Sequence, residues 1–379
     1  MIPFSQPDLA GNELQQIAMA LESGKLAGNG QFTALCEHWL ESKLGVHRAL
    51  LAHSGTGALE MAALIADIRP GDEVIMPSFT FSSTANAFVL RGASPVFVDV
   101  RPDTLNLDER LIAERLTPRT RAIVPVHYGG VSCEMDAIMA LANLHGLTVI
   151  EDAAQALLAT YKGVPLGTIG HLSAFSFHAT KNVTSGEGGA LILKTSDHAL
   201  RAEIIREKGT NRSQFIRGEV DKYTWSGLGS SYVPSEILAA LLWSQLNAAH
   251  QLTEQRLVRW QRYHAAFAQL EREGMLTRPN VPGHCHHNGH VYYILLDDTD
   301  IRGRLIDFLR ERGICVAWHF IPLHSSPYAT AQGWTCSLPV TDDISGRILR
   351  LPMFASLGDD DQARVIKDVV SFFGGILRN

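Results

Sequence analysis

The chain has few of the features that mark secreted, membrane-spanning or nucleic-acid-binding proteins. Five cysteines occur in 379 residues with no CxxC pair, so neither a disulfide framework nor a zinc ribbon is expected. No apolar run reaches the roughly 18 residues that a membrane helix needs, and MIPFSQPDLAGNE lacks the features of a signal peptide. Acidic residues outnumber basic ones, 39 to 33, and no basic tail argues for a nucleic-acid partner. We therefore expect a cytoplasmic protein without membrane or nucleic-acid partners.

Short apolar runs alternate with helical patterns through the first half of the chain. This alternation predicts βαβ units, and thus an α/β fold with a mostly parallel central sheet and helices on both faces. In such sheets, ligands bind beyond the carboxyl ends of the strands. The predicted strands are 72–78, 94–100, 121–128, 147–152, 172–178 and 189–194, with helices at 56–68 and 135–146.

The second half predicts a smaller unit. A long helical pattern over 235–272 is followed by the strand-like VYYILL (291–296) and ICVAWHF (314–320). Helical patterns lie at 302–313 and 360–373. Since one domain usually has about 100–200 residues, we predict two: a large one over 1–245, and a linking helix with a smaller C-terminal α/β domain over 246–379.

Three short segments carry candidate chemistry. Asp152 ends an apolar strand, where it either binds a ligand or caps a following helix. Lys181 follows the strand LSAFSFH and is either a desolvated amine nucleophile or a surface lysine. The segment 53–59, HSGTGAL, opens a helix whose free N–H groups suit a phosphate, unless Ser54 or Thr56 only caps it.

The combination is more specific than any single segment. A phosphate site, a carboxylate at a strand end and a lysine after a later strand together meet the needs of pyridoxal 5′-phosphate (PLP). The lysine amine binds the cofactor covalently, and the carboxylate keeps the pyridine nitrogen protonated so that the ring accepts electrons. No GxxxxGK[ST] or GxGxxG motif is present, which argues against nucleoside triphosphate and dinucleotide binding.

These segments resemble the sugar aminotransferases of the DegT/DnrJ/EryC1/StrS family, which have the type I fold of PLP enzymes. The resemblance extends from Pro3 to the C-terminus through GDEVIMPSFTF (71–81), EDAAQ (151–155), FSFHATKN (175–182), GEGG (186–189) and IPLH (321–324). Segments 76–93 and 203–215 are similar to the branch that aminates C4 of dTDP-4-keto-6-deoxyglucose for enterobacterial common antigen. The resemblance thus implies a nucleotide-sugar substrate and L-glutamate as amino donor.

The resemblance also implies roles for individual residues. Lys181 would bind PLP and move the proton at the substrate carbon. The other implied cofactor contacts are Asp152 at the pyridine nitrogen, Gln155 near the ring hydroxyl, Phe81 on the ring face, and Gly55, Thr56 and Ser176 at the phosphate. The implied substrate contacts are His324, Arg212 and Tyr223.

One family segment departs from its usual form. Many relatives have a GYNYR-like sequence whose asparagine reaches the phosphate of the neighbouring subunit in a homodimer. This chain has GSSYV (229–233), and only Ser231 could replace that asparagine, with a shorter reach. We still expect a homodimer with active sites at the interface.

Two clusters need separate interpretation. The segment HCHHNGH (284–290) favours a polar loop over a metal site, because adjacent residues rarely supply converging ligands. Four basic residues between 206 and 217 form either a solvated loop or an attractive field for a diphosphate.

Three rival functions remain. Two are amination at another sugar carbon and amination with the opposite configuration. The third is a non-catalytic PLP-binding regulator, but such proteins usually append a DNA-binding module.

Overall fold

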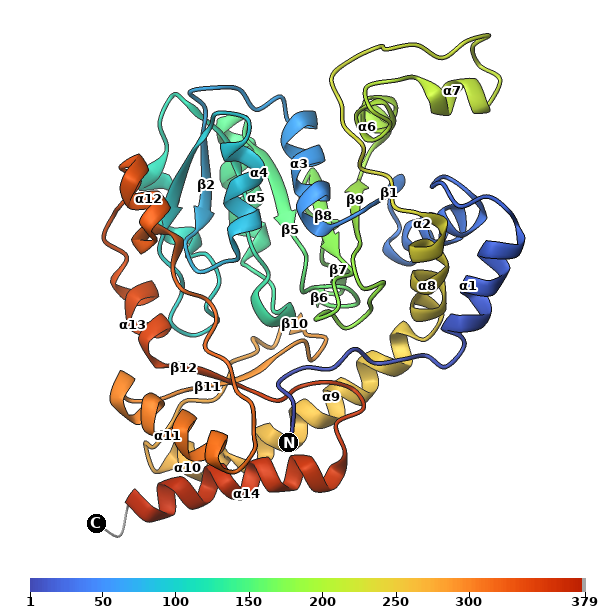
Figure 1. Cartoon of the computed structure of the whole chain (residues 1–379). Coiled ribbons are helices and arrows are strands. Elements are labelled where there is room, and N and C mark those ends of the chain that lie inside the picture. The colour runs from blue at the N-terminus through green and yellow to red at the C-terminus, as the bar shows by residue number, and fades with distance from the viewer. Residues whose placement is uncertain (377–379) are drawn as a thin grey trace.

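The computed structural model describes residues 1–376 and has a seven-stranded sheet at its centre (Figure 1). The strand order is β1-β9-β8-β5-β4-β2-β3; only β9 runs against its neighbours, so the sheet is mostly parallel and the predicted fold class is confirmed. Its strands are β1 (Arg48–Ala52), β2 (Glu73–Pro77), β3 (Ser94–Val98), β4 (Thr120–Ile123), β5 (Thr148–Asp152), β8 (Leu172–Ser176) and β9 (Gly189–Leu193).

Helices cover both faces of this sheet, because its strands alternate their apolar side chains between two cores. In β1, Ala49 and Leu51 join the core under α2, α5 and α8, while Leu50 and Ala52 join the core under α3, α4 and α6. These helices are α2 (Gln31–Leu44), α3 (Gly55–Ile65), α4 (Ser82–Val89), α5 (Met135–His145), α6 (Ala199–Arg206) and α8 (Glu236–Asn247), and α1 (Glu13–Glu22) packs on α8.

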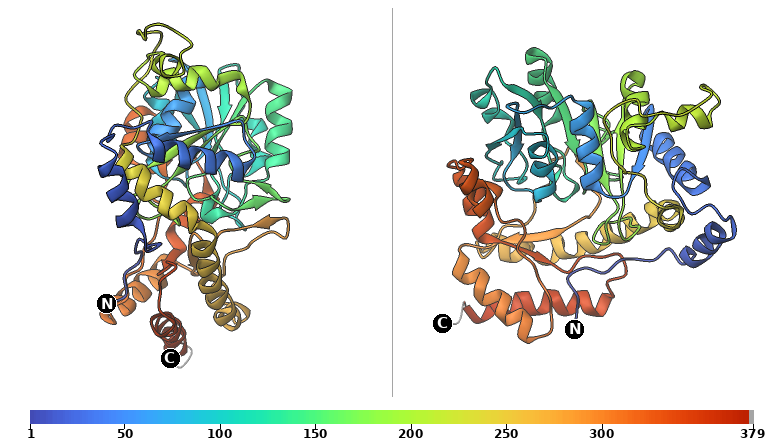
Figure 2. Two further views of the ribbon diagram at one scale, coloured as in Figure 1. Left: turned by 90° about the vertical axis from the view of Figure 1, so that its right-hand side faces the viewer. Right: turned by 45° about the horizontal axis from the view of Figure 1, so that its top comes forward.

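A third core joins the last part of the chain to Ile2 at the N-terminus. Its helices are α9 (Ala249–Ala266), α10 (Ala268–Arg272), α11 (Thr299–Glu311) and α14 (Asp359–Ile376), and its sheet pairs β11 (Tyr292–Leu295) with β12 (Ile348–Leu351). In Figure 2, α14 lies at the opposite end of the molecule from α7 (Arg212–Ile216). The predicted division near residue 245 falls near the end of α8 and stays a prediction.

The remaining elements are short. The strands β6 (Thr160–Tyr161), β7 (Val164–Pro165) and β10 (Cys285–His286) form a small sheet, and α12 (Pro327–Gln332) and α13 (Pro339–Arg347) pack beside the large sheet (Figure 1). Over residues 1–376, no helix combines the length and apolarity needed to cross a membrane.

The strand predictions are confirmed for six of the seven strands of the central sheet. The sequence did not predict β1, because RALLA is short and its alanine and leucine residues are also typical of helices. The prediction for 314–320 is wrong: this segment forms only isolated bridges, from Ile314 to Ile2 and from Ala317 to Arg350.

Candidate active site

A cavity of about 510 Å³ lies at the carboxyl ends of the parallel strands. Asp152 is the last residue of β5 and Ser176 is the last residue of β8, and both line the cavity. Residues from the C-terminal unit close its other side. The predicted site residues that the fold brings together here are Gly55, Thr56, Phe81, Asp152, Gln155, Ser176 and Lys181.

Asp152 is buried and held from two directions. The Thr84 hydroxyl donates a hydrogen bond of 2.7 Å to Oδ2 of Asp152, and the Ala154 N–H donates one of 3.2 Å to Oδ1. Thr80 in turn lies within hydrogen-bond distance of the Thr84 hydroxyl, at 2.7 Å. Turns and the short strand β6 follow Asp152 rather than a helix, so the helix-capping interpretation is wrong.

Lys181 lines the same cavity. Burial lowers the pKa of its amine to about 8, although the nearby negative charge of Asp152 opposes that shift. The interpretation as an ordinary surface lysine is therefore wrong. An amine with a lowered pKa is partly unprotonated near neutral pH, which is the form that attacks a carbonyl carbon.

The start of α3 has the geometry of an anion site. The Ser54 hydroxyl accepts from Gly57 N–H at 3.0 Å, so the capping interpretation holds for Ser54. Capping and anion binding coexist, because several first-turn N–H groups have no partner within a helix. A Cβ on Gly55 would lie 2.8 Å from the Cβ of Ser176, so glycine permits the close approach of α3 to β8.

Two further side chains border the space between these groups. Phe81 is the N-cap residue of α4, and it is 61% exposed although it lines the cavity. An aromatic ring left open at a cavity wall offers a flat surface for a planar ligand. Gln155 is buried, and its side-chain oxygen accepts from Gly129 N–H at 2.7 Å, which fixes the orientation of its amide.

His324 lies outside the residues that line the cavity. It is buried, with Nδ1 at 2.7 Å from the Ser78 hydroxyl and Nε2 at 3.2 Å from a carboxylate oxygen of Asp342. The Ser78 hydroxyl accepts from the His324 backbone N–H at 2.9 Å, so its proton is free to point to Nδ1. In the single chain, His324 therefore ties the segment before α12 to the loop after β2.

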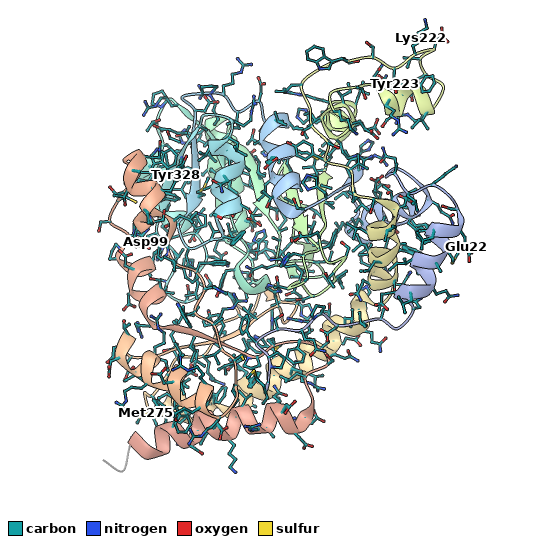
Figure 3. The ribbon with its side chains drawn as sticks, in the orientation of Figure 1. Glu22, Asp99, Lys222, Tyr223, Met275 and Tyr328 are labelled. Atoms are coloured by element: carbon teal, nitrogen blue, oxygen red, sulfur yellow. The ribbon has the colours of Figure 1, made fainter. Side chains whose placement is uncertain are left out.

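Three other predicted residues also lie away from the cavity of their own chain. Ser231 is exposed and forms an isolated bridge with Glu207. Arg212 starts α7 and lies 3.6 Å from the Glu207 carboxylate. Figure 3 shows Tyr223 on the projecting segment that carries α7, where its ring packs at 5.6 Å from the ring of Phe215.

The basic segment 206–217 is largely neutralised by acidic partners. Arg206 is 2% exposed and pairs with Glu37, so it belongs to the interior rather than to a solvated loop. Arg217 pairs with Glu203 at 2.9 Å and with Glu219 at 2.6 Å. These contacts argue against a strong attractive field for a diphosphate within one chain.

The histidine-rich segment 284–290 makes separate contacts. His284 lies 3.0 Å from Glu134, His287 packs against Trp260, and His290 is 2.8 Å from the side chain of Asn182. Across residues 1–376, no cluster of three or more histidine, cysteine, aspartate or glutamate residues could hold a metal ion.

Several residues at the cavity were not predicted: Thr84, Arg256, His290 and Arg350. Arg350 had a signal in the sequence, since it is a lone charge inside the apolar run ILRLPMF. The other three had none, because their place at the cavity depends on contacts between segments far apart in the chain.

Comparison with known proteins identifies the family. The model of the DegT/DnrJ/EryC1/StrS aminotransferase family matches residues 7–370. The chain belongs to this family. It is 37% identical to the spore coat polysaccharide biosynthesis protein SpsC of Bacillus subtilis, over 97% of this chain and 96% of that protein.

Solved structures agree with this assignment. The aminotransferase TlmJ from Streptoalloteichus hindustanus has a TM-score of 0.91 and 30% identity, with both chains covered completely. The putative sugar aminotransferase Spr1654 from Streptococcus pneumoniae, in its PLP form, has a TM-score of 0.90 and 26% identity, covering 98% of this chain and 97% of that one. Spr1654 has also been solved in a form with pyridoxamine phosphate (PMP). The predictions of a sugar aminotransferase and of PLP as cofactor are thus confirmed.

Proposed function

We propose that this aminotransferase moves an amino group from L-glutamate to C4 of dTDP-4-keto-6-deoxy-D-glucose. The product is dTDP-4-amino-4,6-dideoxy-D-galactose, for the synthesis of enterobacterial common antigen. The observation that carries the aminotransferase chemistry is the meeting of Lys181 and Asp152 in one cavity beside the start of α3. The choice of sugar rests on the resemblance of segments 76–93 and 203–215 to the branch that uses it.

The residues at the cavity fit PLP. The N–H groups of Gly55 and Thr56 and the Ser176 hydroxyl would hold the phosphate, since a helix N-terminus favours negative charge. Asp152 would accept a hydrogen bond from the pyridine nitrogen and keep it protonated. Phe81 would lie against the cofactor ring, and Gln155 would lie near the ring hydroxyl. PLP, when bound, supplies an electron-accepting ring and a carbonyl carbon that exchanges amino groups.

Lys181 has two tasks in this proposal. Its amine would bind the cofactor covalently until the amino group of the donor replaces it. The freed amine would take a proton from the α-carbon of the donor and later deliver one to C4 of the sugar. A lowered pKa suits both directions of this transfer, because general acid–base groups work best when their pKa lies near the working pH.

The substrate contacts and the assembly are part of the same proposal. His324 contacts the sugar after rearrangement of its bond to Asp342, and Ser231, Arg212 and Tyr223 serve the active site of a second copy in a cytoplasmic homodimer. Exposed apolar side chains on and after α7 support such an interface: Phe215, Ile216, Tyr223, Trp225 and Leu228.

Product analysis tests the proposal most directly. The holoenzyme is incubated with L-glutamate and dTDP-4-keto-6-deoxyglucose, and the product is examined by NMR. We expect nitrogen at C4 in the galacto configuration. Nitrogen at C3, or the gluco configuration at C4, would assign the chain to another branch of the family. If L-glutamate leaves the absorbance of bound PLP unchanged, the proposed donor is wrong.

A further inference from the structure

Arg350 extends from the small sheet into the active-site cavity. It lies in β12, where its neighbours Leu349 and Leu351 point into the core of the C-terminal unit. Because side chains alternate along a strand, Arg350 points to the opposite face. There it lines the cavity together with Lys181 and Asp152, and only 9% of its surface is exposed.

Its guanidinium has no acidic partner in the chain described, residues 1–376. Nε of Arg350 is fully buried without a hydrogen-bond acceptor, and no ion pair joins this side chain to any carboxylate within those residues. The guanidinium lies over the aromatic ring of Phe4, whose centroid is 5.3 Å from the guanidinium carbon. A cation over an aromatic face is stabilised much less than a cation paired with a carboxylate.

The other buried arginine at the cavity, Arg256, provides a contrast. It donates to the backbone carbonyls of Gly289, His290 and Met353, at 3.2, 2.8 and 3.0 Å, and lies 3.6 Å from Asp8. Its donors are therefore occupied by the protein itself. By contrast, the buried Nε–H donor of Arg350 has no acceptor among the described residues.

A buried charge without a partner destabilises a protein, and such groups persist where a ligand supplies the partner. Arg350 also lies near the reacting amine, since its positive charge contributes to lowering the pKa of Lys181. An anion held there must be close to the carbon that exchanges its amino group. An amino acid fits this requirement, because its α-carboxylate is one bond from that carbon. The diphosphate of a nucleotide sugar fits less well, since it is attached at C1 and the reaction occurs across the ring at C4.

We propose that Arg350 binds the α-carboxylate of the amino donor. The inference rests on the proposed amino-acid donor but not on the identity of the sugar. When the sugar replaces the amino acid, no carboxylate adjoins the reacting carbon, and the Phe4 ring remains beside the guanidinium. One cavity can thus accept two chemically different substrates in turn.

The test compares Arg350→Met, Arg350→Lys and a control, Arg310→Met, as holoenzymes without any sugar. Arg310 is an exposed arginine on α11. Single-turnover loss of cofactor absorbance is measured with L-glutamate and with 4-aminobutanoate, which is glutamate without its α-carboxylate. The quantity compared is the rate with L-glutamate divided by the rate with 4-aminobutanoate. We expect Arg350→Met to reduce this ratio by about 100-fold, as for the loss of charged hydrogen bonds. Arg350→Lys should restore part of the ratio, and Arg310→Met should keep the wild-type ratio.

Two equilibrium measurements separate binding from folding. Calorimetry should show weaker binding of glutarate, a non-reacting dicarboxylate, to Arg350→Met, with a smaller effect on dTDP. The melting temperature of Arg350→Met should equal or exceed that of the wild type, because a buried unpaired charge is removed. An unchanged substrate preference would overturn the proposal, as would a loss of dTDP binding with glutarate binding intact. Failure of the sugar assignment would leave all these results unaffected.

Discussion

The hydroxyl of Thr84 on α4 donates a hydrogen bond of 2.7 Å to the carboxylate of Asp152 at the end of β5. Residues 68 positions apart thus share one buried contact, and a second contact at 2.7 Å continues to Thr80. Carboxylate oxygens have freedom to rotate unless they are held. Thr84 on one oxygen and the Ala154 N–H on the other therefore fix the orientation of the Asp152 carboxylate. Each oxygen can accept a further hydrogen bond, which is the capacity that the proposed contact to the pyridine nitrogen requires.

Replacing Thr84 with valine tests this positioning role. A hydrogen bond to a charged group contributes about 1.5–3 kcal/mol, so we expect the dissociation constant of PLP to rise about tenfold or more. Thr84→Ser keeps the hydroxyl and should restore binding. Thr330→Val is a matched control, because the Thr330 hydroxyl bonds only within its own helix on the surface. Equal PLP affinity in Thr84→Val and the wild type would contradict the role.

Asp152→Asn should separate cofactor retention from catalysis. PLP should remain bound, but the charge that stabilises the protonated ring is lost. We expect a loss of about 3 kcal/mol in transition-state stabilisation, roughly a hundredfold or more in rate. Asp136→Asn removes an exposed carboxylate paired with Lys162 and should leave the rate unchanged. Turnover of Asp152→Asn near the wild-type value would show that the carboxylate has no role at the ring.

The lowered pKa of Lys181 predicts how cofactor binding depends on pH. The unprotonated amine attacks PLP, and the pKa of about 8 places its titration well below that of an ordinary lysine. The rate at which apoenzyme gains the cofactor absorbance should therefore rise about tenfold per pH unit up to about pH 8 and then level off. Stopped-flow mixing of apoenzyme with PLP measures this rate. A rate still rising at pH 10 would show that burial does not depress the pKa.

Covalent labelling identifies the amine itself. Borohydride reduction of the holoenzyme should fix the cofactor to a peptide that contains Lys181, found by mass spectrometry. Lys162 is the matched competitor, since it is exposed and its hydrogen bond to Asp136 raises its pKa and keeps it protonated. Lys208 is exposed as well. A label on either of these lysines would exclude Lys181 as the cofactor-binding residue.

The sequence was sufficient to predict the groups that lie at strand ends, because strand order and direction determine where those ends meet. Asp152 follows from the apolar pattern of β5. Ser176 was implied by the family resemblance, because the predicted strand extended to residue 178 and β8 ends at Ser176. The predicted phosphate site at α3 follows from the helix start. Thr84 reaches the cavity only through packing between distant segments, and local patterns contain no information on that packing. Arg350 is marked in the sequence as a lone charge in an apolar run, but the run does not show which cavity the side chain faces. His324 belongs to a family motif, yet its contacts to Ser78 and Asp342 could not be read from neighbouring residues.

The proposed homodimer leads to a test with mixed subunits. Arg212 is outside the cavity of its own chain and its side chain is 42% exposed. If it serves a nucleotide diphosphate, it must do so for a second copy, since a two-fold interface lets each chain supply charge to the other. Arg212→Ala should then weaken nucleotide-sugar binding while the absorbance of bound PLP stays unchanged.

Hybrids of Arg212→Ala and Lys181→Ala chains give the decisive measurement. In such a hybrid, one of the two sites receives Lys181 from one chain and Arg212 from the other, so about half of the wild-type activity should return. Each variant alone should remain weakly active or inactive. Arg310→Met paired with Lys181→Ala serves as a control for subunit exchange, because Arg310 is exposed on α11. An active monomer in sedimentation would refute the dimer. Verified hybrids without rescue would show that Arg212 does not act across the interface, because the site with an intact Lys181 would then lack the Arg212 of its own chain.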